Sequence, residues 1–383
     1  MTEKISCNIP SDKRIPMHKV FMPSNLKEII EPLEEVFKSG WIGEGPKVRE
    51  FENLIGNFIG NNKVTALNNC TSALHMALRL SNIKQGDEVI STPMTCTATN
   101  IPILHTGAKI IWADINPKTG NIDSESIKKK ITDKTKAIMI VHWGGYPCDL
   151  DEINEIAREK GIRIIEDAAH AIGSLYKKKM VGNHSDFACY SFQAIKHITT
   201  GDGGIIACKN KEDYERTRLL KWYGIPRETR KPSILGHPEY DILEAGYKFH
   251  MNDISAAIGL AQFKYLEKNI AIRRRNAKGY NEELLDIPKL ELCENKNDRS
   301  SAYWLYSLLV KDRIDFIKKL ASKGIESSVV HVRNDVYSIF KGIDNKNLVG
   351  LDEFSSKMIC IPVGHWVSEE DAQFIIETIK EMR

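Results

Sequence analysis

Short runs of β-forming residues alternate with helical patterns along the chain from about residue 63 to residue 208. The run 137–141 is apolar at every position, as strands buried on both faces are. Because the intervening segments are long enough to be crossover helices, the pattern predicts an α/β fold with a mostly parallel sheet. Seven strands are expected, at residues 63–69, 87–92, 108–115, 135–143, 162–169, 186–193 and 203–208.

A chain of 383 residues is too long for one small domain, so a large domain and a smaller one are expected. Helical patterns at 72–80, 124–130 and 150–160 accompany the strands, and a longer pattern covers 253–270. The charged run Arg273-Arg274-Arg275 follows that pattern, and we place the domain boundary nearby. The two predicted domains are a large one, residues 1–265, and a small α+β one, residues 266–383, with a strand at 304–310 and a helix at 315–323.

Composition argues against several kinds of partner and site. The net charge is only +3 and basic and acidic residues are interspersed, so no nucleic-acid-binding or membrane-binding surface is predicted. No apolar run is long enough to span a membrane, and the first 25 residues are charged and lack the apolar core of a signal peptide. The eight cysteines form no CxxC pair, which favours free thiols over disulfides or a metal site. We therefore expect a cytoplasmic protein without a bound metal.

The most informative segment runs from Ser191 to Gly204, where a predicted strand ends and a glycine-rich turn opens the next one. It contains a single lysine, Lys196. An aldehyde cofactor needs a lysine with a near-neutral pKa, held rigidly by the surrounding backbone. The alternative is a surface lysine in a loop.

A second segment places Asp167 at the carboxyl end of a predicted buried strand, where an unpaired carboxylate is costly. The protonated nitrogen of a pyridine ring would supply the partner and would stay protonated as an electron sink. The alternative is an Asp that caps the following helix. His170, three residues on, could lie against such a ring or be a structural histidine.

A third segment, residues 68–75, is a polar turn that opens a helix directly after a strand. Free N–H groups and the helix dipole make such a turn an anion site, which would suit a cofactor phosphate. Any N-capped helix looks similar, so the signal is weak alone. The hydroxyl of Ser191 could contact the same phosphate.

These three segments, in this order, resemble the DegT/DnrJ/EryC1/StrS family of sugar aminotransferases, a branch of the fold-type-I enzymes that use pyridoxal 5'-phosphate (PLP). The resemblance covers nearly the whole chain and extends to residues 40–46, 51–52, 142–149, 246–259 and 361–362. It implies the PLP fold-type-I large domain with a smaller C-terminal domain.

The resemblance also implies roles for individual residues. Lys196 would be the catalytic Schiff-base lysine and would carry a proton between cofactor and sugar. Asp167 would pair with the pyridine nitrogen, and His170 would lie beside the ring oxygen. The residues expected to hold the phosphate are Thr71, Ser72 and Ser191, and those expected at the substrate are Trp41, Gly43, Glu44 and His331.

Three positions depart from the usual family pattern. Cys96 stands where relatives often place an aromatic ring over the cofactor, and Cys70-Thr71-Ser72 replaces Gly-Thr-Ala. Gly246-Tyr247-Lys248 replaces Gly-Tyr-Asn. In the family two subunits share each active site and this asparagine reaches the neighbour's phosphate, so a homodimer is expected in which Lys248 takes that role. The alternative is a solvated lysine, with His250 serving instead.

The resemblance implies that L-glutamate loads the cofactor and that the resulting pyridoxamine 5'-phosphate (PMP) aminates a keto-sugar linked to a nucleotide. An NDP-4-keto-6-deoxyhexose, with perosamine-type 4-amination for lipopolysaccharide O-antigen or another surface glycan, is the expected substrate. Alternatives within the family are a 3-aminotransferase and a sugar 3-dehydratase, in which histidine replaces the lysine, so that Lys196 argues against it. A non-catalytic regulatory member is the alternative of a different class.

Overall fold

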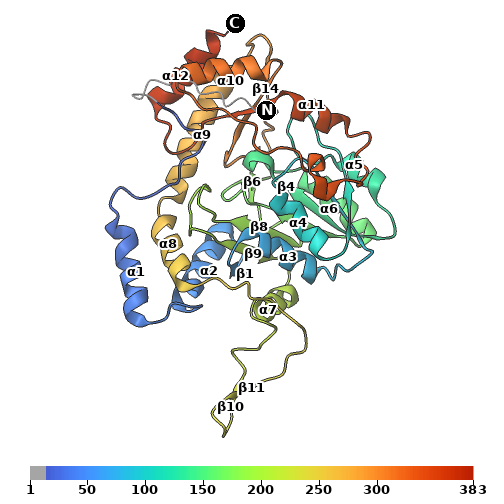
Figure 1. Ribbon diagram of the computed structural model, residues 1–383, viewed down its shortest axis with the longest axis vertical. Coiled ribbons are helices and arrows are strands. Elements are labelled where there is room, and N and C mark those ends of the chain that lie inside the picture. Colours follow the sequence, from blue (N-terminus) through green and yellow to red (C-terminus); the bar gives the residue numbers. More distant parts are fainter. Residues whose placement is uncertain (1–13, 383) are drawn as a thin grey trace.

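The computed structural model describes residues 14–382 of the chain (Figure 1). Residues 1–13 lie outside this range. They include Cys7, one of the eight cysteines, and Lys4, Asp12 and Lys13, three of the charged residues that argue against a signal peptide. The seven predicted strands all form, and they join one sheet in the order β1-β9-β8-β5-β4-β2-β3. The strands are β1 (Val64–Leu67), β2 (Glu88–Ser91), β3 (Lys109–Trp112), β4 (Thr135–Val141), β5 (Arg163–Asp167), β8 (Phe187–Ser191) and β9 (Gly204–Cys208).

All pairs in this sheet are parallel except those of β9, which runs antiparallel to β1 and β8. The predicted mostly parallel α/β sheet is therefore confirmed. Alternate residues of a strand enter different apolar clusters: Met139 and Ile165 lie in one, and Ile138 and Ile164 lie in another. Both faces of the sheet are thus buried, which explains why these strands read as continuous apolar runs.

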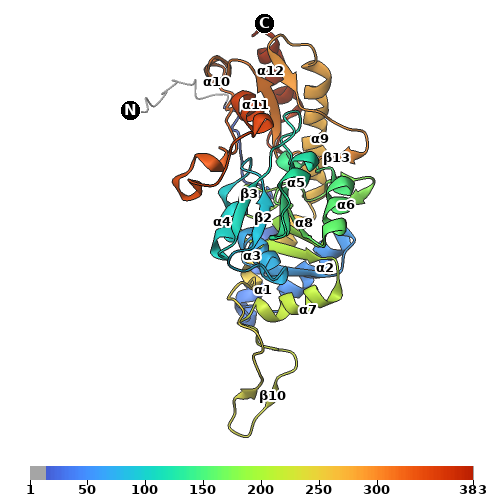
Figure 2. The ribbon, with the colours of Figure 1, turned by 90° about the vertical axis from the view of Figure 1, so that its right-hand side faces the viewer.

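Helices cover both faces of the sheet (Figures 1 and 2). Helices α3 and α4 lie on one face of the sheet. Helices α2 and α8 pack against each other over another part of the sheet. The bounds of the helices of this region are Lys27–Ser39 (α1), Pro46–Ile59 (α2), Cys70–Leu80 (α3), Thr97–His105 (α4), Ser124–Lys130 (α5), Leu150–Lys160 (α6), Lys211–Leu220 (α7) and Asp253–Phe263 (α8).

The C-terminal part lies at one end of the sheet, and a hairpin of β10 (Lys231–Pro232) and β11 (Pro238–Glu239) projects from the other end (Figure 1). The C-terminal part contains a three-stranded sheet of β12 (Leu290–Leu292), β14 (Tyr306–Val310) and β15 (Met358–Ile361). Its helices are α9 (Leu266–Glu283), α10 (Arg313–Ser322), α11 (Val349–Lys357) and α12 (Glu369–Lys380). The N-terminal segment joins it, because Ile15 pairs with Ile325. The division of domains at residue 265 stays a prediction.

Three short strands and three 3₁₀ turns complete the connections. The strands β6 (Leu175–Tyr176), β7 (Lys179–Met180) and β13 (Arg299–Ser300) form a small separate sheet. The 3₁₀ turns are η1 (Trp143–Gly145), η2 (Asn334–Val336) and η3 (Ser338–Phe340). Within residues 14–382 no helix has both the length and the apolar composition needed to cross a membrane.

Three sequence predictions about the region after residue 250 are wrong in detail. The single helix expected at 253–270 is two helices, because Tyr265 N–H bonds to Gln262 O and closes α8 with a tighter turn. The apolar spacing continues across this break, so periodicity alone misses it. The arginine run lies within α9 instead of after a helix, and Trp304 precedes strand β14 instead of opening it.

The carboxylate of Asp253, in the first turn of α8, holds the start of helix α2. It accepts backbone N–H bonds from Gly45, Lys47 and Val48 at 2.8–3.1 Å, and its side chain is 2% exposed. Because Asp253→Ala leaves these N–H groups without a partner, we expect it to lower the free energy of unfolding by about 2–3 kcal/mol. Urea denaturation measures this. Asp312→Ala removes the exposed cap of α10 and is the matched control, with an expected loss of about 1 kcal/mol; equal losses would contradict the special role of Asp253.

Candidate active site

The carboxyl ends of the parallel strands bring the predicted cofactor residues to one edge of the sheet. Asp167, the last residue of β5, pairs with Val141 at the end of β4 and with Cys189 of β8. Lys196 follows β8 in the loop that leads to β9. Ligands in sheets of this kind bind at this edge, so the site forms where the topology predicts it.

Asp167 is a buried carboxylate with two neutral donors. Its Oδ2 accepts from Thr99 Oγ1 at 2.7 Å, and its Oδ1 accepts from the Ala169 N–H at 3.0 Å. Burial raises the pKa of Asp167 above its ordinary value, and the two hydrogen bonds and the charge of Lys196 oppose that rise. Within residues 14–382 it forms no ion pair. A protonated ring nitrogen would fit here, because it would supply the missing cation.

Lys196 is partly buried, and burial lowers the pKa of its amine from the ordinary 10.5 to about 8. The nearby carboxylate of Asp167 is the largest influence that opposes this shift. An amine with a pKa near neutrality is available as a nucleophile and as a proton carrier. This is the state that an aldehyde cofactor requires of its lysine.

Beside Lys196 lies a set of nearly parallel rings, which we call the ring stack: His18, His170, Trp304 and His331. The His170 and Trp304 rings are 3.9 Å apart between centroids at 17°. His331 is 5.7 Å from His170 and 6.0 Å from Trp304, and His18 is 5.4 Å from Trp304. The structure therefore brings the predicted residues His170 and His331 together, and adds two residues that the sequence did not indicate.

The three imidazoles of the ring stack are neutral at physiological pH. Burial, followed by the charge of Lys196, lowers the pKa of His170 well below its usual range and that of His331 to about 4. Burial and the charges of Arg273 and Lys196 lower the pKa of His18 to about 4. Among the described atoms, His170 Nδ1 and His331 Nε2 are buried without a hydrogen-bond partner. A bound ring or substrate that reached either nitrogen would supply its missing partner.

Strand β9 brings the predicted phosphate residues together. Its first residue, Gly204, pairs with Ser191 at the end of β8 and with Leu67 at the end of β1, directly before the turn into α3. A Cβ at Gly204 would lie 2.4 Å from the Asn69 backbone, so only glycine allows this approach. The start of α3, with Thr71 and Ser72, thus lies beside Ser191.

The expected phosphate site at the start of α3 differs from a helix N-terminus without a side-chain cap. The Asn69 side chain accepts the Ser72 N–H at 2.7 Å, so Ser72 retains only its hydroxyl for an anion. The first N–H groups of a helix have no partner inside the helix, and Thr71 carries one of them. Cys96 is the N-cap residue of α4 and is partly buried. It lies near the site, because Thr99 in the first turn of the same helix bonds to Asp167.

The remaining predicted residues gather around Trp222. Trp41 and Glu44 line the same surface pocket as Trp222, and Glu44 forms ion pairs with Lys221 and Arg227 at 2.6 and 3.0 Å. The Lys248 amine lies 3.4 Å from the centroid of the Trp222 ring. Gly43 O accepts the Asp253 N–H. In the part of the chain that the structure describes, no hydrogen bond, ion pair or ring contact joins Trp41, Gly43, Glu44 or Lys248 to Lys196.

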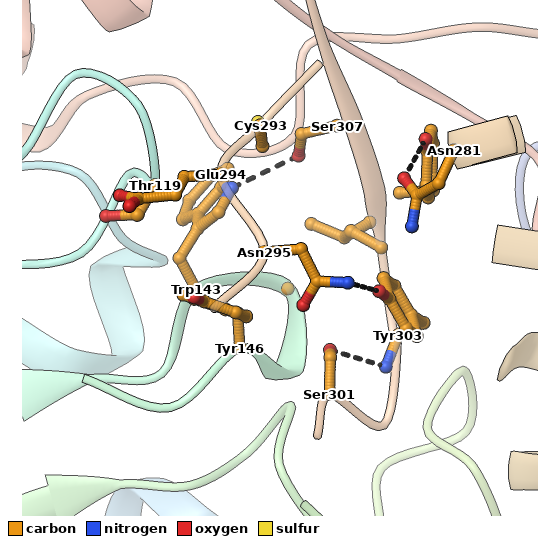
Figure 3. A pocket seen from close by; sticks show the side chains of 13 residues that line it. Thr119, Trp143, Tyr146, Asn281, Cys293, Glu294, Asn295, Ser301, Tyr303 and Ser307 are labelled. Atoms are coloured by element: carbon orange, nitrogen blue, oxygen red, sulfur yellow. Dashed lines mark hydrogen bonds between the residues drawn. The ribbon is translucent and has the colours of Figure 1, made fainter. Parts of the chain in front are cut away.

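A separate pocket lies between η1 and the segment 293–307 (Figure 3). Trp143, Asn281, Asn295 and Tyr303 are among its lining residues. It contains none of Lys196, Asp167 and His170, so it is not the candidate active site.

Sequence reasoning missed His18, Thr99, Arg273 and Trp304. Trp304 and His18 reach the site through contacts between segments that are far apart in the sequence, and no local pattern marks them. A signal for Arg273 exists: Asn269, Arg273 and Asn276 recur at helical spacing, and all three are buried on one face of α9.

Comparison with known proteins agrees with the fold and identifies the family. The model of the DegT/DnrJ/EryC1/StrS aminotransferase family matches residues 23–380. The sugar aminotransferase CalS13 from Micromonospora echinospora is 37% identical, with a TM-score of 0.90 over 96% of this chain and 99% of that one. Spr1654 from Streptococcus pneumoniae, solved in PLP and PMP forms, is 29–30% identical, with TM-scores of 0.87–0.88 over 96% of this chain and 97–98% of Spr1654.

Two further relatives are similar to this chain over nearly their whole length. Spore coat polysaccharide biosynthesis protein SpsC of Bacillus subtilis is 33% identical in an alignment that covers 94% of this chain and 97% of SpsC. GDP-perosamine synthase of Escherichia coli O157:H7 is 32% identical, and that alignment also covers 94% of this chain and 97% of the relative.

The fold and the family match together define the class: a fold-type-I sugar aminotransferase, an enzyme whose family implies a PLP or PMP cofactor. The chain belongs to the DegT/DnrJ/EryC1/StrS aminotransferase family. The resemblance seen in the sequence is confirmed, while the roles of the individual site residues remain proposals.

Proposed function

We propose that this enzyme transfers an amino group from L-glutamate to a nucleotide-linked keto-sugar, an NDP-4-keto-6-deoxyhexose, at C4 in the manner of perosamine formation. The observation that carries the reaction is a lysine of near-neutral pKa beside a buried, cation-free carboxylate. Similarity to a GDP-perosamine synthase and to a spore coat polysaccharide protein supports the sugar class and a role in surface-glycan biosynthesis. Free thiols at the described cysteines agree with a cytoplasmic location.

When bound, the cofactor supplies an aldehyde carbon that takes up the amino group and a protonated pyridine ring that withdraws electrons. Asp167 keeps the ring nitrogen protonated, and Thr99 and the Ala169 N–H hold its two oxygens in place. Lys196 would carry the proton to and from the carbon that bears the amino group. Thr71, Ser72 and Ser191 would hold the phosphate. His170, whose Nδ1 has no hydrogen-bond partner among the described residues, would lie beside the ring oxygen.

The function is tested by incubating the purified enzyme with PLP, L-glutamate and a panel of NDP-4-keto-6-deoxyhexoses and 3-keto isomers. The release of 2-oxoglutarate together with a 4-amino sugar nucleotide is the expected result. A 3-amino product would replace the proposal by 3-amination. Loss of the C3 oxygen without a new amine would show a dehydratase, and no reaction with any keto-sugar would favour a non-catalytic role.

We further propose that the enzyme is a homodimer with shared active sites and that Lys248 reaches the phosphate bound by its neighbour. Support comes from large apolar side chains that are exposed at the end of α1 and in the α1–α2 connection, and in the projecting segment 231–243: Phe37, Trp41, Ile42, Ile234, Leu235 and Leu243. Lys248 is itself exposed, and its only described partners are the Trp222 and Tyr223 rings. An ammonium group can satisfy a phosphate as a point charge.

Mixing two inactive variants tests the shared site. Lys196→Ala removes the reactive amine, and Lys248→Glu places a like charge against the phosphate. Under conditions that exchange subunits, we expect activity to return, because one of the two sites in each mixed dimer regains both groups. Lys38→Glu, on the exposed face of α1, is the charge-matched control and should keep its activity alone. Monomers in sedimentation, or no recovery despite proven exchange, would leave Lys248 a surface residue.

A further inference from the structure

The loop that carries Lys196 is fixed to residues 302–304 of the C-terminal part. The Trp304 indole N–H donates to Ile195 O at 3.0 Å, and His197 Nε2 is 3.0 Å from Ala302 O. Between these two bonds the Lys196 amine lies over the Trp304 ring, 3.6 Å from its centroid. Trp304 is only 2% exposed, so its ring has little freedom to move away from the amine.

Residues 302–304 are held in place from several sides. Arg273 on α9, which is 1% exposed, donates to the carbonyl oxygens of Tyr303 and Trp304, both at 3.2 Å. Tyr303 has a φ of +46°, a left-handed conformation that a non-glycine residue keeps only when its surroundings enforce it. Figure 3 shows two more restraints: Tyr303 N–H bonds to Ser301 Oγ, and the Asn295 amide bonds to Tyr303 Oη. Together these contacts aim the indole at Lys196.

We propose that Trp304 is a positioning residue for Lys196, and that its indole face holds the protonated amine at the reacting edge of the site. The inference rests on the proposed function of Lys196. A ring face attracts a cation and does not attract a neutral amine in this way, and indole is the strongest of the aromatic side chains in this respect. The amine therefore stays in place whenever it is not bonded to the cofactor, and it does not swing into solvent.

Several other groups act on the same amine. Asp167, Cys70 and Cys96 favour its charged form, and burial and Arg273 disfavour it. His18, His170, His197 and His331 also lie within reach of its charge. Like Asp167, Cys70 and Cys96, the indole face favours the charged form of Lys196, because it stabilises only the protonated amine. Removing the ring must therefore lower the pKa of Lys196, whereas loss of packing alone, by admitting water, would raise it.

The test measures the pKa of Lys196 in the full-length chain freed of cofactor. Acetic anhydride labels lysines in their neutral form, and the yield on the peptide containing Lys196 is followed against pH by mass spectrometry. We expect Trp304→Leu to lower this pKa by about one pH unit and Trp304→Phe to lower it less. Trp112→Phe is the control, since Trp112 is buried against Phe340 and no lysine among residues 14–382 lies over its ring; it should leave the pKa unchanged.

An unchanged or raised pKa in Trp304→Leu would overturn the proposal. So would equal decreases in the leucine and phenylalanine variants, because the lost bond to Ile195 O, and not the ring face, would then be responsible. If the leucine variant loses its cooperative thermal unfolding, the phenylalanine variant decides alone, and a pKa at or above that of the unchanged protein contradicts the proposal. Attachment of the cofactor to another lysine would end the proposed role of Lys196 in catalysis, yet the labelling result would still report on Trp304.

Discussion

Replacing Lys196 by arginine is expected to abolish amine transfer while the protein stays folded. Arginine keeps the positive charge over the Trp304 ring and has a similar length, but its guanidinium stays protonated at all accessible pH values. It can therefore neither bind an aldehyde carbon nor accept a proton. We expect turnover to fall by at least about 10⁴-fold, the combined loss of a nucleophile and of a general base.

The measurement is the release of 2-oxoglutarate from L-glutamate in the presence of PLP and the keto-sugar nucleotide. Lys211→Arg is the matched control, because Lys211 is an exposed lysine of α7 that pairs with Glu215 on the same helix, and its variant should keep full activity. Thermal unfolding at an unchanged midpoint establishes that Lys196→Arg is folded. Turnover within tenfold of the unchanged enzyme would show that another group supplies the amine.

Replacing Asp167 by asparagine is expected to reduce turnover by about 10²–10³-fold, the size found when one preorganised electrostatic partner is removed from an active site. The asparagine oxygen can still accept the Ala169 N–H, and its amide NH2 can donate to the Thr99 hydroxyl oxygen, so both contacts can be kept with the second one reversed in direction. It cannot stabilise a protonated ring nitrogen by charge. The loss should therefore appear in kcat, with the same assay as for Lys196.

The stability of the cofactor-free protein separates this role from that of a helix cap. Because the folded-state pKa of Asp167 is raised, the unfolded chain releases this proton at lower pH than the folded chain does, and folding becomes less favourable as the pH rises above the ordinary value. Asp167→Asn removes that cost. We expect an unfolding free energy at pH 7 that is unchanged or higher, by urea denaturation. Lower stability with near-normal turnover would identify Asp167 as a structural residue.

The sheet could be predicted from the sequence because burial on both faces leaves a local trace. The central strands contain short apolar runs, and the polar residues that end them, such as Asp167 and Ser191, mark the carboxyl edge where the site forms. The antiparallel placement of β9 between β1 and β8 has no such trace. It depends on Gly204 meeting the Asn69 backbone, a contact between residues far apart in the chain.

In the active site, too, contacts between residues far apart in the chain could not be predicted from local sequence patterns. Lys196, Asp167 and His170 lie in local motifs, His331 follows only from the family resemblance, and the structure gathers all four. Trp304 could not be predicted, because its position follows from the left-handed Tyr303 and from the buried Arg273 on a separate helix. In the sequence the arginine run served only to mark the expected domain boundary. Its first member is instead a buried donor to backbone carbonyls, and only the observed path of α9 reveals this.

The most direct test of the account is the identity of the lysine that binds the cofactor. The enzyme is incubated with PLP, reduced with borohydride and digested, and the phosphopyridoxyl group is located by mass spectrometry. We expect the label on the peptide containing Lys196 at about one group per chain, and its loss after prior treatment with L-glutamate, which frees the lysine. Label on any other lysine, or none, would contradict it.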